Sequence, residues 1–539
     1  MALEASSGKK LSGLILFEDE HLLVVNKPAG MNTHAPSPYA GEGIYEWFKH
    51  REPRWATLAI VHRLDKETSG VLVFGKTTVA NKSLTEQFTE HSIQKKYVLL
   101  TNRVVKPGMI KVTSCLVRAG EKYLSRPEHA GGERAETHFQ AIGSEAGRVL
   151  VEAQPVTGRT HQIRVHAAEQ GFPILGDTLY GGMPAARVFL HAMELKLKHP
   201  VTNKEMTFNA PADFEANARL KLREAFIDTN ETSAWRLIHG ASDRWPGWYV
   251  ERLGEFLLSQ SEQSLNENQH AELGRLLDVY GLRGAYHKTL TRQVRRTNVQ
   301  QASPQLVLGE AAPEVFNIRE NGVEFELSFG EGYSVGLFLD QRDNRRRFLS
   351  NHVAAGFPLF VRGAKDMEVL NAFAYTCGFS VCAAKAGART TSLDLSKKYL
   401  EWGKRNFALN QMDPAQHDFI YGDAFDWMRR LAKKGREFDV IVMDPPTFSQ
   451  SKERGAFQAE KDYGELVSAA LPLLKPNGVL LASTNAARLE PEKFLEMVKE
   501  PIEAAGRKVV KEHYVPQPPD FPISRDELAY LKTVWLRLE

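Results

Sequence analysis

The stretch MEVLNAFAYTCGFSVCAAKAGARTTSLDLSKKYLEWGKRNFALN, residues 367–410, decides the fold of the C-terminal half. It begins with an apolar run, and a helix is predicted over residues 380–386, followed by the β-rich TTSLDL and the helical KKYLEWGKRNFALN. The series continues with HDFIYG, a helix over 425–432, FDVIVMD, a helix over 463–471 and GVLLAST. This strict alternation of strands and helices predicts a doubly wound parallel sheet, an α/β Rossmann-like fold.

The N-terminal half follows a different pattern. From Leu14 to about Phe208, short β-rich runs such as LILFEDEHLLVVNK, GVLVFGK and RVLVEAQPV are separated by Gly and Pro turns, which predicts a mainly antiparallel α+β fold. Residues 210–233 resemble a linker that is helix-prone in its middle, and short strands with the turn-rich WRLIHGASDRWPGWYVERLG follow. We therefore expect a multidomain protein with an α+β domain over 1–225, a small β-rich domain over 226–330 and an α/β domain over 331–539.

Composition excludes several classes of protein. Of 539 residues, 25% are charged and 42% hydrophobic, with 40 Gly and 26 Pro, so the chain is neither collagenous nor disordered. Its three cysteines, Cys115, Cys377 and Cys382, are too few and too scattered for a disulfide scaffold or a metal site, which favours a reducing compartment. The start MALEASSGKK has no apolar signal core, and no apolar run reaches about 18 residues. We expect a cytoplasmic protein without a membrane segment or a bound metal.

The net charge of +3 is too small to indicate nucleic-acid binding by itself. Basic residues do cluster locally, at Lys95-Lys96, at Arg292 with Arg295-Arg296, and at Arg342 with Arg345-Arg346-Arg347. Taken alone, each cluster is interpreted as a solvated face before it is interpreted as a phosphate site.

Two charged segments of the N-terminal half contain candidate catalytic residues. HRLDKETSG, residues 62–70, places Asp65 between basic neighbours on a loop that enters the strand VLVFGK. GRTHQIRVH, residues 158–166, follows another strand and brings Arg159, His161, Arg164 and His166 close together in sequence. Composition alone would leave Asp65 as a turn residue paired with its neighbours.

Five segments occur in the order typical of one enzyme family: NKPAG (26–30), HRLDKETSG, KKY, GRTHQIRVHAAEQGFPILGDTLYG (158–181) and LHAMELKLKHP (190–200). Residues 12–215 thereby resemble RluA-type RNA pseudouridine synthases. The resemblance implies isomerisation of uridine in RNA without a cofactor. It implies that Asp65 is the catalytic carboxylate, Arg164 its paired cation and Tyr97 the ring that packs on uracil. His62 and Arg63 would hold the loop, or fill the gap that a flipped uridine leaves.

Polar residues follow four successive strand ends of the C-terminal half. The first is the turn of VLNAFAYTCGFS, which includes Phe373, Tyr375, Cys377 and Gly378 and is where a class I methyltransferase holds S-adenosylmethionine. Asp394 ends the next strand, at the place of a ribose-binding carboxylate, and Asp423-Ala424 follow the third strand at the place of an adenine contact. Ligands of such folds bind at this edge of the sheet, so a cofactor site is predicted here.

The fourth strand ends in DPPTF, residues 444–448. Because proline fixes φ and lacks an N–H, Pro445 and Pro446 make a rigid loop that presents the Asp444 carboxylate and backbone carbonyls to a base amino group. Phe448 can stack on that base once it is flipped out. A tight proline turn without catalytic function is the alternative.

A second resemblance covers residues 234–539. WRLIHGASDRWPGWYVERLG, GLFLDQRDNRR (336–346), VLNAFAYTCGF, DPPTF and the late YLK (530–532) are similar to the segments of RlmI/RlmK-type large-subunit rRNA methyltransferases. The resemblance implies that S-adenosylmethionine is the cofactor and that Phe338 and Gln341 lie beside it. It also implies an RNA partner, large-subunit rRNA in the first place and tRNA in the second. The sequence predicts no oligomeric state.

The nature of the methylated atom follows from the cysteines. Methylation of pyrimidine carbon 5 normally requires a cysteine near strand four or five, where this chain has DPPTF and ASTNA instead. A base nitrogen, with guanine as the leading candidate, is therefore favoured over carbon 5. Two other readings stay open: one half serves only as an RNA-binding module, or the methyl acceptor is a protein or a small molecule. The basic run 342–347 and the physical linkage to an RNA enzyme argue against the latter.

Overall fold

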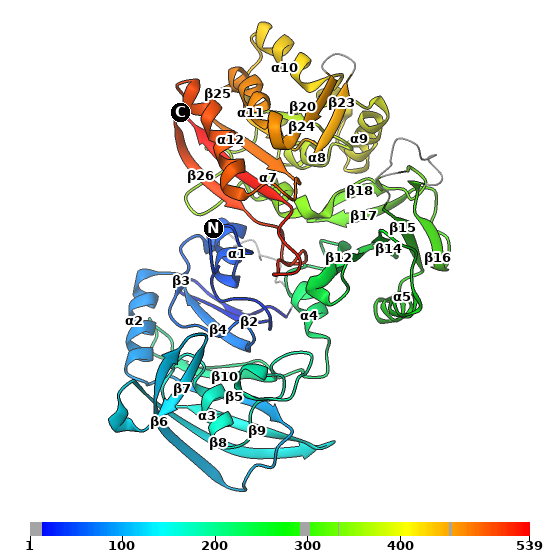
Figure 1. The fold of residues 1–539 in the computed structure, drawn as a ribbon. Coiled ribbons are helices and arrows are strands. Elements are labelled where there is room, and N and C mark those ends of the chain that lie inside the picture. The colour runs from blue at the N-terminus through cyan, green and yellow to red at the C-terminus, as the bar shows by residue number, and fades with distance from the viewer. Residues whose placement is uncertain (1–12, 291–301, 333, 452–454) are drawn as a thin grey trace, which may run out of the picture. The chain divides into compact units, whose positions relative to one another are not determined.

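The computed structural model describes residues 13–539 except 291–301, 333 and 452–454 (Figure 1). The chain forms two compact units. The first consists of the described part of residues 1–36 with 42–49 and 57–226, and the second consists of 37–41, 50–56 and the described part of 227–539. The predicted division into three domains remains a prediction. Among the described residues, no helix is long and apolar enough to cross a membrane.

The first unit is built on an 11-stranded sheet in which every pairing is antiparallel except that of β10 with β4. The strand order is β1-β2-β4-β10-β5-β9-β8-β6-β7, with β11 beside β10 and β3 beside β4. This confirms the mainly antiparallel α+β fold. The strands are β1 (Ile15–Glu18), β2 (Leu22–Lys27), β3 (Ala59–Ile60), β4 (Ser69–Gly75), β5 (Gln94–Thr101), β6 (Met109–Ala119), β7 (Lys122–Arg126), β8 (Glu133–Glu145), β9 (Arg148–Pro155), β10 (Leu190–Lys198) and β11 (Glu205–Asn209).

Helices of this half of the chain are short. The α-helices are α1 (Ile44–Arg51), α2 (Thr78–Thr89), α3 (Gln162–Glu169) and α4 (Ala218–Ala225), and the 3₁₀ helices are η1 (Pro53–Trp55), η2 (Glu128–Ala130) and η3 (Thr178–Tyr180). Helix α2 begins after Thr77, whose side chain accepts the Ala80 N–H, and it buries Ala80 and Leu84 in a cluster with residues of β2 and β4. Helix α4 lies within the segment that was predicted to be a helix-prone linker.

The second unit contains the predicted doubly wound sheet, in the order β21-β20-β19-β22-β25-β27-β26. The first five strands are parallel, and β27 runs antiparallel to both of its neighbours. The strands are β19 (Glu368–Ala372), β20 (Arg389–Asp394), β21 (Asp418–Tyr421), β22 (Phe438–Met443), β25 (Leu474–Thr484), β26 (Val509–Val515) and β27 (Lys532–Leu538), and a hairpin β23 (Phe448–Ser451) and β24 (Gly455–Gln458) follows β22.

Helices cover both faces of this sheet (Figure 1). Buried residues of α7, α8 and α9 form one core cluster with Val369, Val440 and Leu481, whereas those of α10, α11 and α12 form a second cluster with Leu370 and Leu480. Side chains of one strand thus alternate between the two cores, as a sheet buried on both faces requires. The helices are α7 (Arg342–Ser350), α8 (Gly378–Lys385), α9 (Lys397–Leu409), α10 (Ala424–Lys433), α11 (Ala459–Ala470) and α12 (Pro491–Ala504), with 3₁₀ helices η6 (Leu339–Gln341), η7 (Pro414–Gln416) and η8 (Leu471–Leu473).

The β-rich segment ahead of this sheet forms a five-stranded sheet, in the order β12-β13-β14-β15-β16, and a hairpin of β17 and β18. Its buried Phe256, Phe325 and Leu327 belong to the same core cluster as α7 to α9. Its elements are β12 (Ala234–His239), η4 (Gly240–Asp243), β13 (Trp248–Leu253), β14 (Phe256–Ser261), α5 (Glu267–Tyr280), β15 (Gly284–Thr289), β16 (Gln305–Gly309), β17 (Phe316–Glu320) and β18 (Val323–Leu327).

Candidate active sites

Asp65 lies on the loop between β3 and β4, and a buried lysine forms hydrogen bonds with the backbone near it. The Lys27 Nζ, at the end of β2, donates to the carbonyls of Met31 at 2.8 Å and Lys66 at 3.3 Å. The side chain is fully buried, and burial lowers the pKa of Lys27 to about 7. Thr33 adds two hydrogen bonds to the backbone of Leu64. These hydrogen bonds therefore fix the backbone of Leu64 and Lys66, the two neighbours of Asp65.

Arg164 comes from α3 and faces Asp65. Its Nε and Nη2 donate to the two oxygens of Asp177 at 2.7 and 2.8 Å, and both side chains are buried. Its Nη1 lies 3.6 Å from Oδ2 of Asp65. The ring of Tyr180 packs under the guanidinium, 5.1 Å from ring centroid to Cζ. Because Asp177 holds two of its nitrogens, the guanidinium has a fixed orientation toward Asp65.

A cavity of about 780 Å³ opens over Asp65, and Tyr97, His161 and Lys95 are among its lining residues. Tyr97 on β5 has its pKa raised by burial and by the charge of Asp65. The His161 Nε2 lies 3.9 Å from Asp65, and its Nδ1 is 2.8 Å from the Tyr180 hydroxyl. Burial lowers the pKa of Lys95 to about 8. The cavity is large enough for one nucleotide, and a carboxylate, a guanidinium and a phenol ring are among the groups that line it.

His62 and Arg63 line the same cavity in different ways. The His62 Nε2 accepts the N–H of Val73 at 3.1 Å, and the imidazole stacks on Phe88 with ring centroids 4.5 Å apart. Burial and then the charge of Lys95 lower the pKa of His62 to about 3, so the ring is neutral and holds the loop. Arg63 is exposed, so its guanidinium is open to solvent.

The predicted cofactor turn follows β19. Phe373, Tyr375 and Cys377 all have left-handed backbone, with φ of 63°, 49° and 63°. Such conformations are costly outside glycine and occur at functional turns. The Tyr375 N–H donates to Asp394 at 2.8 Å, and the Ser396 N–H donates to the other carboxylate oxygen at 2.8 Å. The turn thus places the partly exposed Asp394 carboxylate at the edge of the sheet, where burial raises its pKa.

The side chain of Cys377 does not face this edge. It is fully buried, and a Cβ added to Gly403 of α9 would collide with its sulfur. Gly378, the first residue of α8, is also buried, against Leu337 and Arg345. These two residues can contact a cofactor through their backbone alone.

Asp423 and Ala424 begin α10 after β21. The Asp423 carboxylate accepts the Asp426 N–H at 3.1 Å, so it caps the helix, and Ala424 is buried. Gly422 has φ of 150°, and a Cβ there would collide with the indole of Trp427. Only glycine fits at this position, beside the place that was predicted for adenine.

Asp444 follows β22 and is held by an amide. The Gln341 Nε2 donates to Asp444 Oδ2 at 3.1 Å and to Ser483 Oγ at 2.8 Å, and Asn344 donates to the Gln341 Oε1 at 2.7 Å. Burial, and then the charge of Asp340, raises the pKa of Asp444 to about 7. Gln341 is 2% exposed, so it orients Asp444 from the interior.

The residues after Asp444 point in different directions. Pro445 is buried, Pro446 is exposed, and Phe448 is 50% exposed at the start of β23. Tyr463 of α11 ties the loop to the sheet, because its hydroxyl lies 3.0 Å from the Met443 carbonyl and accepts the Ser483 N–H at 2.8 Å. The DPPTF loop is thus anchored at its base and presents an aromatic ring at its end.

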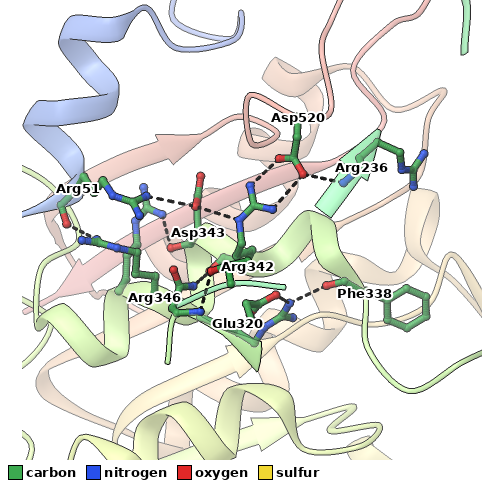
Figure 2. A network of polar contacts seen from close by, with 12 residues as sticks. Arg51, Arg236, Glu320, Phe338, Arg342, Asp343, Arg346 and Asp520 are labelled. Atoms are coloured by element: carbon green, nitrogen blue, oxygen red, sulfur yellow. Dashed lines mark hydrogen bonds and ion pairs between the residues drawn. The ribbon is translucent and has the colours of Figure 1, made fainter. Parts of the chain in front are cut away.

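The arginines of α7 do not form the solvated face that the sequence predicts for them. Arg342 pairs with Asp520, Arg345 pairs with Glu320, and Arg346 donates to the Arg51 carbonyl and to Glu52 (Figure 2). All of these arginines are buried or nearly so. The run is neither a solvated face nor an exposed phosphate site, so using it as an argument for an RNA substrate was wrong. The Arg292 and Arg295-Arg296 cluster lies outside the described residues.

Sequence reasoning missed four residues that organise the two sites. Lys27 lies within NKPAG, and Asp177 and Tyr180 lie within the segment 158–181, but the sequence predicts no role for them. Tyr463 carried no signal at all, since it is one aromatic residue on a helix. Asp177 and Tyr180 act through Arg164 of the same segment, whereas Lys27 and Tyr463 act through residues outside any shared motif.

Comparison with known proteins gives two family matches. Residues 21–169 match the family described as RNA pseudouridylate synthase, and residues 236–537 match the S-adenosylmethionine-dependent methyltransferase family. A ribosomal RNA large subunit methyltransferase of Deinococcus radiodurans is 32% identical over 318 residues, which are 57% of this chain and 73% of that protein. Ribosomal RNA large subunit methyltransferase I of Tolumonas auensis is 33% identical over 322 residues, which are 58% of this chain and 77% of that protein.

Solved structures also match this chain. The crystal structure of SMU.776 complexed with SAH has a TM-score of 0.51 and 26% sequence identity. The match covers 70% of this chain and 98% of that chain.

Proposed function

We propose that this chain, which belongs to the S-adenosylmethionine-dependent methyltransferase family and also carries an RNA pseudouridylate synthase domain, modifies large-subunit ribosomal RNA in two ways. The two domains make it a bifunctional RNA-modifying enzyme. Its relatives from Deinococcus radiodurans and Tolumonas auensis are described as ribosomal RNA large subunit methyltransferases, which supports ribosomal RNA as the substrate. Transfer RNA is the second candidate, and the cytoplasm is the proposed location.

For the synthase half, the carrying observation is the Asp65 carboxylate beside Arg164 in the cavity. Asp65 acts on the ribose of a flipped uridine, either by attacking it or by removing a proton, while the C–N bond to the base breaks. The Arg164 guanidinium, 3.6 Å from Asp65, balances the charge of this carboxylate and fixes its surroundings. Tyr97 packs on the uracil ring, which rotates. A bond then forms between its carbon 5 and the ribose as the ribose leaves Asp65 or regains its proton, and the proton on carbon 5 is lost. Arg63 contacts the RNA, and no cofactor takes part.

For the methyltransferase half, the main support is that Asp394, Asp423 and Asp444 lie at the ends of successive strands of the sheet. S-adenosylmethionine supplies an activated methyl group when it is bound. The left-handed turn at Phe373 and Tyr375 leaves the Asp394 carboxylate partly exposed, which fits a ribose with two hydroxyl donors. Asp423 and the backbone of Ala424 flank the adenine. Cys377 and Gly378 contribute backbone to the turn.

The acceptor group faces Asp444, which Gln341 holds in place. The ionised carboxylate accepts a hydrogen bond from a base amino or imino group, and Pro445 and Pro446 keep the loop rigid. Phe448 stacks on the flipped base. We propose a base nitrogen, with guanine first, because Cys377 and Cys382 are buried and burial raises the pKa of both thiols, that of Cys377 to about 12. Pyrimidine carbon 5 is the alternative.

The test uses the purified chain with ribosomal RNA that lacks both modifications. Pseudouridine formation is followed by release of tritium from uracil carbon 5, and methylation by transfer of label from S-adenosylmethionine. Mass spectrometry of the nucleosides identifies the methylated base. We expect both signals in ribosomal RNA and a methylated guanine; label in pyrimidine carbon 5 would overturn the nitrogen proposal, and label in protein alone would overturn the RNA substrate.

A further inference from the structure

The two lysines at the start of β5 lie in different environments. Side chains of a strand alternate between the two faces of a sheet, so Lys95 and Tyr97 share one face and Lys96 lies on the other. Lys95 and Tyr97 both line the cavity over Asp65. Lys96 instead forms an ion pair with Glu194 of the neighbouring strand β10, at 3.2 Å. The basic cluster at 95–96 therefore consists of one paired surface lysine and one lysine of the cavity.

Lys95 is a partly buried cation without a counter-ion. Its Nζ donates to the Thr157 carbonyl at 3.3 Å, and a Cβ added at Gly158 would lie 3.4 Å from the same nitrogen. Among the described residues, no carboxylate forms an ion pair with Lys95, and burial alone lowers its pKa to about 8. An ammonium carries several N–H donors, and this contact uses only one of them. Because an unpaired charge is costly to bury, the group is suited to binding an anion that enters the cavity.

Other charged groups of the cavity already have partners. The Asp65 carboxylate faces Arg164, whose Nη1 lies 3.6 Å away, and the Nη1 of Arg159 lies 3.7 Å from Glu133. Lys95 is therefore not needed to balance Asp65. The cavity volume of about 780 Å³ is in the upper part of the range for small-molecule sites, so there is room beyond a uracil ring and its ribose.

Resting on the proposed function, we propose that Lys95 binds a backbone phosphate of the RNA, next to the uridine that enters the cavity. In that function Tyr97 packs on the uracil ring and Asp65 acts on the ribose. Lys95 precedes Tyr97 by two residues on the same face, about 7 Å along the strand, which is comparable with the reach of a nucleotide from its base to its phosphate. A phosphate oxygen accepts from the ammonium and supplies the missing negative charge. Lys95 is thus a substrate-binding residue that recognises the RNA backbone rather than a base.

Three variants separate this role from a general effect of surface charge. Lys95→Gln removes the charge and keeps an N–H donor, whereas Lys95→Arg keeps both. Lys96→Gln is the matched control, because it removes the same charge from the adjacent residue, which is paired with Glu194. The probe is an RNA oligonucleotide that spans the uridine of ribosomal RNA converted by the wild-type full-length chain.

Tritium release from the oligonucleotide measures KM and kcat for each variant. We expect Lys95→Gln to raise KM roughly tenfold or more and to leave kcat within about threefold, because binding is lost and the chemistry is not. Lys95→Arg should raise KM by less than about threefold, and Lys96→Gln should change it by less than about twofold. The slope of log affinity against log salt concentration should become shallower by about 0.7 in Lys95→Gln, as expected for one lost phosphate contact on a single strand.

Neutral methylphosphonates identify the phosphate that Lys95 contacts. The phosphates on the 5′ and 3′ sides of the target uridine are replaced one at a time. We expect one of the two replacements to weaken binding to the wild type about as much as Lys95→Gln does, and to cause little further loss in Lys95→Gln itself. The position that shows this coupling is the phosphate at Lys95.

Four results would overturn the proposal. These are equal effects of Lys95→Gln and Lys96→Gln, a loss of kcat at unchanged KM, fully additive losses with both methylphosphonates, and a fall in the thermal midpoint of Lys95→Gln accompanied by a loss of kcat. Wild-type chain that binds both methylphosphonate oligonucleotides as tightly as the unmodified one would also overturn it, whatever the variants do. Failure of the wild-type chain to form pseudouridine in ribosomal RNA would instead contradict the proposed function.

Discussion

The guanidinium of Arg164 lies 3.6 Å from the Asp65 carboxylate, and Asp177 holds it there through two shorter hydrogen bonds. Arg164 therefore serves two carboxylates at once. One of them, Asp177, is 1% exposed and depends on Arg164 for its charge balance.

Arg164→Lys should lower pseudouridine formation by more than a hundredfold, because an ammonium cannot make two parallel hydrogen bonds to Asp177 and also face Asp65. It should also lower the free energy of unfolding by about 2 kcal/mol, because the buried Asp177 carboxylate loses one of its two hydrogen bonds from residue 164. Tritium release and denaturant titration measure the two effects. Arg159→Lys, which changes an arginine with more exposure, is the control; equal losses in both variants would contradict the geometry.

Methyl transfer should depend on the ionisation of Asp444. Because the pKa of Asp444 is about 7, the neutral form dominates below this pH, and it carries no charge and is a weaker hydrogen-bond acceptor than the carboxylate. The kcat/KM for methyl transfer should thus fall about tenfold per pH unit below about 7 and level off above it. Asp444→Asn should abolish this dependence. A profile that is flat between about pH 5.5 and about 8 in the wild type would contradict a dependence of methyl transfer on the ionisation of Asp444 with a pKa of about 7.

The raised pKa of Asp444 should also make the free energy of unfolding depend on pH. A folded-state pKa above the usual value of about 3.9 means that folding favours protonated Asp444. Its contribution to stability is present at low pH and is lost as the pH rises through about 7. Asp444→Asn should therefore raise the free energy of unfolding at pH 8 by about 1 kcal/mol or more, and the gain should vanish near pH 4. A loss of stability at pH 8 would contradict the assignment of burial as the cause.

Gly422→Ala should disturb the cofactor edge of the sheet. The added Cβ meets the Trp427 indole in a backbone conformation that disfavours side chains, so we expect a loss of about 2–4 kcal/mol of stability and weaker binding of S-adenosylhomocysteine. Gly435→Ala is the matched control, since Gly435 also has positive φ but has open space around it. Its cost should stay near 1 kcal/mol, as expected for backbone strain alone. Similar costs for the two variants would show that Trp427 moves aside.

Methylation should not require any cysteine. Cys377→Ala and Cys382→Ala remove buried thiols from the α7–α9 side of the sheet, so each should cost about 1 kcal/mol of stability while the rate of methyl transfer stays within about twofold. Thermal melts and label transfer measure the two quantities. A variant that folds normally but no longer methylates RNA would establish a thiol nucleophile and favour pyrimidine carbon 5 as the acceptor.

The sequence predicted what depends on local pattern. The alternation around residues 367–410 predicted the parallel sheet, and helices expected over 380–386 and 425–432 appear as α8 and α10 with ends shifted by one or two residues. Candidate site residues could be chosen because motifs and strand ends place them, and the structure brings Asp65, Tyr97 and Arg164 to one cavity.

Residues that depend on distant partners could not be predicted. The arginines of α7 look like a basic surface until Asp520, which is 178 residues from Arg342, is placed beside them. Tyr463 acquires its role only through the ends of β22 and β25. Such pairings are set by the packing of whole elements, so no spacing in the sequence encodes them.

The central claim is that one chain carries two independent RNA-modifying sites. The most direct measurement is nucleotide-resolution mass spectrometry of ribosomal and transfer RNA from a strain that lacks the protein, rescued separately with Asp65→Asn and Asp444→Ala variants. The account predicts that Asp65→Asn restores the methyl group without the pseudouridine, and that Asp444→Ala restores the pseudouridine without the methyl group. Full restoration of both modifications by either variant would contradict it.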